Sequence, residues 1–480
     1  MINKYELKHL HPHSFTLSAA VKCNLRCEYC TLDKTLNNKS EELFKNTVEA
    51  LENGTYINNV KKAFERMEES PNNIYEFQIW GQEPTIILPY VTKHWAEWYK
   101  LFPNIEHTFF STNAMNCVNQ IYDFVTTVDS LATQPIKMEI QISYDGYIGT
   151  NKVRKGSADL IKDNLIKVIK KLNNVYLKYV DLTFCLHGVI SHEIFNNLTT
   201  MKQIDEYFTE IDNFLLKLKE TCINKKIHHT LLTLLLVNGA DFTTEDGLNL
   251  TNFVRKVNIL KEQKHYSYFE RCDDFIFQVL GPAGEEAYRR VKNGDFNTLD
   301  EYVESRYHHD GDMKQIPTCL PIMGDFKIMY NGDVTFCQNS IHDTNLNEDD
   351  MTDSIFDQSR KHQMRNVKCN LVTGTDEEIS HFLYIVSQYA NGGITKAYLN
   401  ETMNYLFLLA QCGQVDKAYC TDLEKLKRHA FLISFLNTCY WNLSIKTGSP
   451  TIRNIQDMRI YGNGVLDILE DAVRRAKNER

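Results

Sequence analysis

Cys23-Asn24-Leu25-Arg26-Cys27-Glu28-Tyr29-Cys30 is the stretch that decides how this chain is interpreted. It directly follows residues 15–20, an apolar run that predicts a β-strand. Three cysteine thiolates in so short a loop can converge on one metal cluster, and iron–sulfur clusters are normally held by four such thiolates. Three ligands leave one iron open, and an open position lets a metal centre engage a substrate directly. The stretch therefore predicts an iron–sulfur site with one open position.

Two other interpretations of these cysteines remain open. A structural zinc ion would need a fourth ligand nearby, and the candidates are His11 and His13, although both precede the strand. The other alternative is a group of buried thiols without a metal. The chain has 13 cysteines, which a reducing compartment explains by metal ligation or burial better than by disulfides. Five that lie in apolar or helical surroundings are expected in the core: Cys117, Cys185, Cys222, Cys272 and Cys439.

The bulk composition is that of a globular protein with more than one domain. Its 480 residues exceed the usual size of one domain, and 43% hydrophobic residues supply a core. The net charge of −9 comes from acidic and basic residues mixed along the chain, so we expect neither nucleic acid nor a membrane as partner. The apolar run 231–237 is too short to cross a bilayer. Residues 1–10 lack the apolar core of a signal peptide, so we expect a cytoplasmic protein.

Strand patterns alternate with helical patterns through the first half of the chain. Ser157 can cap a helix in which Ile161, Leu165, Ile169 and Leu172 share one face. Because such alternation forms βα units, the expected fold class is α/β, with a parallel sheet or partial barrel. A loop-rich segment begins near residue 270, and the pattern from about 372 to 480 is helical. The expected strands are residues 15–20, 76–80, 107–111, 138–143, 177–186 and 229–237.

Four motifs in chain order resemble those of the radical S-adenosylmethionine (SAM) superfamily. They are the cysteine loop with Tyr29 before its last cysteine, Trp80-Gly81-Gln82-Glu83-Pro84-Thr85, Ser111-Thr112-Asn113, and Ser143-Tyr144-Asp145-Gly146 followed by Arg154. The resemblance implies a partial (β/α)6 barrel and a [4Fe–4S] cluster held by Cys23, Cys27 and Cys30, with SAM on the fourth iron. It also implies that an electron from the cluster cleaves SAM to methionine and a 5′-deoxyadenosyl radical, which abstracts hydrogen from a substrate. Such sites lie at the carboxyl ends of barrel strands, where the cysteine loop is expected.

The same resemblance implies a set of SAM-binding residues. The segment around Glu83 resembles the family's Gly-Gly-Glu-Pro element, which binds the SAM amino group, but Gln82 replaces the second glycine and reshapes the pocket. The serine and arginine of the fourth motif contact the SAM carboxylate and ribose in related enzymes, and an arginine fork suits a carboxylate. Ordinary strand-end turns are the alternative for each motif. The implied SAM-binding residues are Tyr29, Gly81, Gln82, Glu83, Asn113, Ser143, Asp145 and Arg154.

Cys319 and Cys337 flank a second predicted feature. Asn331-Gly332-Asp333 lies between two apolar runs and predicts a hairpin, which would bring the two cysteines together. Their spacing resembles the start of the SPASM and twitch extensions, which hold auxiliary iron–sulfur clusters. The resemblance then fails, because Cys369 alone follows before Cys412. Either one auxiliary [4Fe–4S] cluster is held by Cys319, Cys337, Cys369 and an unidentified fourth ligand, or the extension is degenerate and holds none.

Several function hypotheses follow from these motifs. The first is a radical SAM oxidoreductase or peptide maturase, similar to the anaerobic sulfatase-maturing enzymes, that abstracts hydrogen from a peptide or protein side chain. The second is a twitch-like dehydrogenase or rearrangement enzyme acting on a small molecule or nucleotide. The third is a non-catalytic cluster or SAM sensor, against which the complete cysteine triad argues. The resemblance implies a flavodoxin- or ferredoxin-type electron donor. The expected domains are a lead at 1–13, the barrel at 14–270, a SPASM/twitch-like extension at 271–371 and a helical region at 372–480.

Overall fold

The structure is a computed structural model, and it describes the larger part of the chain. The residues described are 14–20, 22–28, 39–236, 249, 252, 253, 256, 257, 259, 260, 263, 291–298, 301, 325–334, 369–380, 382, 383, 411, 417–426 and 473–479. No helix among them is both long and apolar enough to span a membrane.

The described strands and helices alternate along the first half of the chain. The strands are β1 (Ser14–Ala20), β2 (Glu76–Gly81), β3 (His107–Thr112), β4 (Ile136–Ser143), β5 (Val180–Ile190), β6 (Ile227–Leu236), β7 (Asp325–Ile328), β8 (Asp333–Val334) and β9 (Cys369–Asn370). The α-helices are α2 (Lys39–Glu52), α3 (Thr55–Met67), α4 (Pro84–Lys93), α5 (Trp95–Leu101), α6 (Val118–Leu131), α7 (Gly146–Ile148), α8 (Ala158–Leu172), α9 (His192–Asn197) and α10 (Met201–Thr221). Short 3₁₀ turns lie at Pro71–Asn73 and Lys417–Cys420, and a π-helical turn lies at Gly149–Val153.

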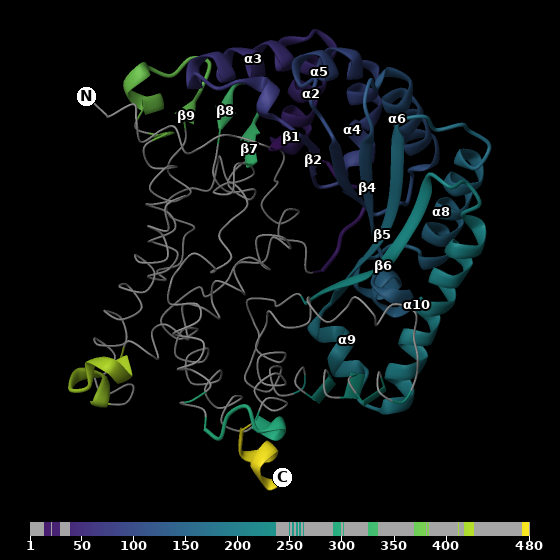
Figure 1. Cartoon of the computed structure of the whole chain (residues 1–480), viewed down its shortest axis with the longest axis vertical. Helices are drawn as coiled ribbons and strands as arrows, with labels where there is room; N and C mark the ends of the chain where they lie inside the picture. The colour runs from purple at the N-terminus through teal and green to yellow at the C-terminus, as the bar shows by residue number, and fades with distance from the viewer. Residues whose placement is uncertain are drawn as a thin grey trace.

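The described strands form one sheet in the order β6-β5-β4-β3-β2-β1-β7-β8-β9. The pairs from β1 to β6 are all parallel and follow the chain order. This confirms the predicted α/β class with a parallel sheet. Parallel neighbours need a crossover connection that returns the chain to the same end of the sheet, and helices provide such connections. The outer helices cover one side of these strands, and β7–β9 extend the sheet beyond β1 (Figure 1).

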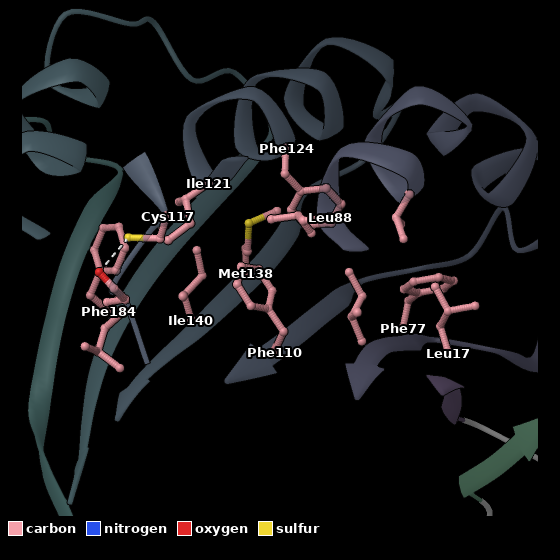
Figure 2. Packing of buried hydrophobic residues seen from close by; sticks show 14 of the residues in the cluster. Leu17, Phe77, Leu88, Phe110, Cys117, Ile121, Phe124, Met138, Ile140 and Phe184 are labelled. Atoms are coloured by element: carbon pink, nitrogen blue, oxygen red, sulfur yellow. Dashed lines mark hydrogen bonds between the residues drawn. The ribbon is translucent and has the colours of Figure 1, made fainter. Parts of the chain in front are cut away.

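The two faces of the sheet differ in chemistry. Along β4, Ile136, Met138, Ile140 and Ile142 are buried, whereas the alternating residues are exposed or half-buried. The buried set packs under the helices together with Leu17, Phe77, Leu88, Phe110 and Phe124 (Figure 2). The other face of β3 and β4 carries half-buried polar groups, among them Ser111, Glu139, Gln141 and Ser143. Because successive side chains of a strand point to opposite faces, one face of the sheet forms the apolar core and the other forms a polar inner face.

Most of the predicted elements agree with the structure. Ser157 caps α8 by accepting a hydrogen bond from Leu160 N, and the predicted face of that helix is buried. Cys117 and Cys185 are buried, as predicted, while Cys222 packs partly buried against the core. Cys272 and Cys439 lie outside the described residues.

The strand predicted at 177–186 was misplaced, since β5 begins at Val180 and continues to Ile190. The reason is Asp129 at the end of α6. Its carboxylate accepts hydrogen bonds from the backbone N–H groups of Lys178, Tyr179 and Val180, which fixes the approach to the strand as a turn. Beyond the predicted end, Val189 and Ile190 still pair with β6.

The predicted hairpin at Asn331-Gly332-Asp333 is confirmed. β7 and β8 are antiparallel, and Ile328 faces Val334. Gly332 has a φ of 90°, a conformation that suits glycine, and Asn331 Oδ1 accepts a hydrogen bond from Asp333 N. β7 also pairs in parallel with β1, so this hairpin continues the main sheet. The described parts of residues 375–480 are largely helical.

Candidate functional site

The cysteine loop leaves the carboxyl end of β1 and is tied to two other strand ends. Glu83 N donates to Lys22 O at 3.1 Å, and Glu28 N donates to Val153 O at 3.0 Å. Cys23 and Cys27 are both half-buried thiols. The loop is therefore anchored beside β2 and beside the segment that follows β4. Tyr29 and Cys30 lie outside the described residues, so the complete triad stays a prediction.

Glu83 joins the ends of β2 and β3. It is 1% exposed and caps α4, whose first residue, Pro84, needs no partner for an N–H group. Its Oε1 accepts hydrogen bonds from Thr85 N, Thr85 Oγ1 and Thr112 Oγ1, and its Oε2 accepts one from Asn113 N at 2.8 Å. Burial raises the pKa of this carboxyl, and the four hydrogen bonds oppose part of the rise. Glu83 thus braces two strand ends, while its predicted contact with SAM stays a prediction.

Two further predicted residues directly precede Glu83, namely Gly81 at the end of β2 and Gln82 after it. Gly81 and Gln82 are half-buried. Gly81 has a φ of 143°, which side chains other than glycine's rarely permit. The backbone that would present carbonyl groups to a ligand is therefore formed with Gln82 in place of the family's second glycine.

Asn113 follows β3 and points its side chain at the cysteine loop. Asn113 Nδ2 lies 2.7 Å from Asn24 Oδ1 and 3.7 Å from Cys23 Sγ, and Asn113 Oδ1 accepts a hydrogen bond from Met115 N at 3.0 Å. With 6% of its surface exposed, the residue has little freedom to turn. The third predicted motif is thus in direct contact with the first.

The end of β4 holds a buried ion pair. Arg154 Nε and Nη2 donate to the two carboxylate oxygens of Asp145 at 2.6 and 2.8 Å. Asp145 is fully buried, Arg154 is 7% exposed, and Val189 N donates to Asp145 Oδ1 at 2.7 Å. Arg154 thus makes a bidentate contact with a carboxylate, as an arginine fork commonly does. The motif resemblance implied a SAM carboxylate as its partner, whereas the partner in the structure is the carboxylate of Asp145. Ser143 lies half-buried on the polar inner face of the sheet, and its predicted SAM contact, like that of Arg154, stays a prediction.

Three residues that complete these contacts lie inside the quoted motifs but were not among the predicted site residues. Thr85 and Thr112 supply three of the four hydrogen bonds to Glu83, and Asn24 receives the Asn113 amide. Thr85 had a local signal, because a helix-capping side chain accepts a hydrogen bond from the backbone N–H of the second or third helical residue, and Thr85 is the second residue of α4. The roles of Thr112 and Asn24 depend on contacts between distant segments and had no local signal.

Of the three cysteines predicted to hold an auxiliary cluster, Cys369 alone lies within the described residues. Cys319 and Cys337 lie outside the described residues. Cys369 is 5% exposed in β9, opposite Val334, and burial raises the pKa of its thiol to about 11. Its predicted role as a ligand of the auxiliary cluster stays a prediction.

The chemistry of the cysteine loop fits an iron–sulfur ligand at Cys23. Leu25 N at 3.4 Å and Asn113 Nδ2 at 3.7 Å both point at Cys23 Sγ. A neutral thiol is a weak acceptor, so two converging N–H groups suit a thiolate. Within the described residues, which include two cysteines of the triad, no three His, Cys, Asp or Glu side chains gather to hold a metal.

Comparisons with known proteins add little to this geometry. No protein-family model matches the chain, and no curated protein matches it. The crystal structure of Streptococcus suis SuiB is similar at 15% identity and a TM-score of 0.36, over 70% of this chain and 62% of that one. The structure of Streptococcus suis SuiB bound to S-adenosylmethionine is similar at 14% identity and a TM-score of 0.37, with the same coverage. The chain thus spans less than two thirds of SuiB, and likeness at this level establishes neither a family nor a function.

Proposed function

We propose that this protein is a radical SAM enzyme. The observation that carries the proposal is that three sequence motifs meet at the carboxyl ends of neighbouring parallel strands. The cysteine loop after β1, Glu83 after β2 and Asn113 after β3 are joined by hydrogen bonds through Lys22, Asn24 and Cys23. Ligand sites of parallel α/β proteins lie at this edge, because the loops there come from neighbouring strands.

Each of these residues then has a role in the proposed site. Cys23, Cys27 and Cys30 would hold a [4Fe–4S] cluster, and the backbone at Gly81 and Gln82 would face the SAM amino group. The Asp145–Arg154 pair would fix the loop after β4, while Ser143, with its half-buried position on the inner face, would line the SAM pocket. Once bound, the cluster would supply one electron that breaks a carbon–sulfur bond of SAM, giving methionine and a 5′-deoxyadenosyl radical that takes a hydrogen atom from the substrate.

The finer parts of the proposal rest on the motif resemblance alone. We propose a partial (β/α)6 barrel, a peptide or protein side chain as substrate, and a flavodoxin- or ferredoxin-type protein as electron donor. One auxiliary cluster at Cys319, Cys337 and Cys369, with an unidentified fourth ligand, belongs to the same proposal. The parallel order of β1 to β6 and the half-buried polar inner face are compatible with a substrate bound inside such a barrel.

Iron content tests the metal site. The protein is reconstituted anaerobically, and iron and sulfide are counted in wild type, in the Cys23/Cys27/Cys30 triple alanine variant and in Cys222→Ala. About four irons lost in the triple variant and none lost in Cys222→Ala support the proposal. Cys222 is a matched control because it packs partly buried against the core and precedes β6, whereas the cysteine loop follows the carboxyl end of β1. Equal iron in all three proteins would sink it. About eight irons in wild type would further support the auxiliary cluster, and about four would remove it.

Turnover tests the chemistry. Reduced, reconstituted protein should form 5′-deoxyadenosine from SAM, and Cys27→Ala should form none while keeping its circular dichroism spectrum. Full turnover in that variant would exclude a radical SAM mechanism through this loop. Transfer of deuterium from a labelled peptide into 5′-deoxyadenosine supports the peptide substrate, and turnover without transfer from any peptide tested favours a small molecule.

A further inference from the structure

The backbone N–H of Asn113 and both polar atoms of its side chain form hydrogen bonds within the protein. Its backbone N–H is bonded to Glu83, its Oδ1 accepts from Met115 N, and its Nδ2 serves both Asn24 and Cys23. A carboxamide nitrogen carries two hydrogens, so one is available for each acceptor. The side chain is buried, and its backbone closes a parallel strand, so the direction of Nδ2 is set by the sheet.

The acceptor of interest is Cys23 Sγ, 3.7 Å from Asn113 Nδ2. Leu25 N approaches the same sulfur at 3.4 Å, within the cysteine loop itself. The loop donor is local, whereas the Asn113 donor comes from β3, 90 residues away in sequence. Nothing in the turn requires the second donor, which therefore needs its own explanation.

We propose that Asn113 is a positioning residue that donates a hydrogen bond to the Cys23 thiolate and thereby raises the reduction potential of the cluster. The inference rests on the proposed function, because it requires a cluster at Cys23. An N–H group aimed at a ligating sulfur stabilises negative charge there, and the reduced cluster carries one electron more than the oxidised one. The hydrogen bond therefore favours the reduced form, which is the form that transfers an electron to SAM.

A second role of Asn113 has to be separated from this one. The bond to Asn24 Oδ1 at 2.7 Å holds the loop mechanically, and losing it could disturb the cluster without any effect of the Nδ2 group on sulfur. The two roles share one nitrogen but have different acceptors. Asn24→Ala removes the mechanical bond alone, whereas Asn113→Ala and Asn113→Ser remove that bond, the bond to Cys23 Sγ and the bond from Met115 N.

The test is a redox titration of the reconstituted cluster, followed by electron paramagnetic resonance, in wild type and these three variants. We expect a more negative midpoint potential in both Asn113 variants and an unchanged potential in Asn24→Ala, with iron content retained throughout because the cysteines carry the ligation. An unchanged potential in the Asn113 variants overturns the inference, as does an equal shift in Asn24→Ala or a loss of iron from the Asn113 variants. Absence of iron from wild type itself would overturn the proposed function, so the two failures are distinguishable.

Discussion

Glu83 shows what burial demands of a single residue at this edge of the sheet. Almost none of its surface is exposed, and four donors from two strand ends surround its carboxylate. An isolated buried carboxylate would cost several kcal/mol, roughly, and donors of this kind offset much of that cost. Burial nevertheless raises the pKa of this carboxyl, so the hydrogen bonds offset only part of the cost.

Replacing Glu83 by Gln removes the ionisable carboxyl and should change how the free energy of unfolding depends on pH. Since the folded pKa is raised, the contribution of the carboxyl is complete below its usual value of 4.5 and is lost as the pH rises through the raised pKa. We expect the unfolding free energy of wild type relative to Glu83→Gln to fall by about 1.4 kcal/mol per pH unit across that interval. Urea denaturation of both proteins from about pH 4 to about pH 8 measures the difference. A difference that is constant, or grows with pH, would contradict it.

Arg154 presents the opposite case, a buried charge with one dominant partner. Arg154→Ala would leave Asp145 buried with its arginine fork removed, so we expect a loss of about 3–5 kcal/mol in the free energy of unfolding. The adjacent Lys155 is the matched control, because its ion pair with Glu28 is largely exposed and Lys155→Ala should cost less than about 1 kcal/mol. Urea midpoints measure both variants. Equal losses would mean that the Asp145–Arg154 pair contributes no more than a surface pair.

Residue identities at the site were predictable only where the sequence repeats a known spacing. The positions of Glu83, Asn113 and Asp145 follow from such spacing, and the structure places each at a strand end. The partners were not predictable. Arg154 matches the position of the arginine in the motif that the sequence resembles. Its guanidinium nevertheless contacts Asp145, a residue nine positions earlier in sequence, and the fold rather than the local sequence determines this pairing.

At the scale of elements, the turn between β4 and α8 is shaped by a close approach to α10. Gly146 has a φ of 70°, and a Cβ at this position would lie 2.5 Å from Cε2 of Tyr207. The Tyr207 hydroxyl donates to Asp145 O at 2.9 Å, so the ring cannot withdraw without breaking that bond. α10 thereby fixes the segment that carries the ion pair.

Gly146→Ala should therefore destabilise the protein by two effects, and Gly54→Ala isolates one of them. Gly54 also has a positive φ, of 77°, but nothing lies within 4 Å of the Cβ that would be added. We expect about 1–2 kcal/mol for Gly54→Ala from the backbone alone, and about 1–3 kcal/mol more for Gly146→Ala from the clash. Thermal or urea denaturation compares them. Equal costs would show that the Tyr207 ring yields freely.

The elements themselves were more predictable than their ends. Strict alternation of buried residues identified β4, and the period of 3.6 identified α8, because each pattern is local. The error at β5 arose because a side chain on α6, Asp129, accepts hydrogen bonds from the backbone N–H groups of the two residues before the strand and of its first residue. A side chain from another element has no signature in the strand's own sequence.

At the scale of the whole molecule, the sheet joins two distant parts of the chain. β7 pairs in parallel with β1, with Thr16 beside Lys327, although more than 300 residues separate them. The hairpin at Gly332 was predictable from its turn residues, but its place at the edge of the sheet was not. Strand pairing over that distance depends on the complete fold, and periodicity reports only on local structure.

Helix α3 holds the two parts together. Tyr56 hydroxyl donates to Ile328 O at 2.8 Å, and Asn59 Nδ2 donates to Tyr330 O at 2.8 Å. Arg66 Nη1 donates to Gly374 O at 2.6 Å. These donors lie along one side of the helix and meet backbone carbonyls of the hairpin and of the segment after β9, so the end of the sheet is clamped by polar contacts as well as by packing.

The clamp predicts a local effect for Asn59→Ala. Losing a hydrogen bond to the backbone should cost about 0.5–1.5 kcal/mol, and the loss should mainly affect the hairpin whose turn contains Tyr330. We expect faster hydrogen exchange at the backbone amides of residues 329–334, measured by mass spectrometry, and unchanged exchange in β3 and β4. Asn58→Ala is the matched control, since Asn58 lies on the exposed side of the same helix. Equal exchange in the two variants would show that packing alone holds β7 and β8 against β1, whereas faster exchange across β1 to β4 would show that the two parts unfold as one unit.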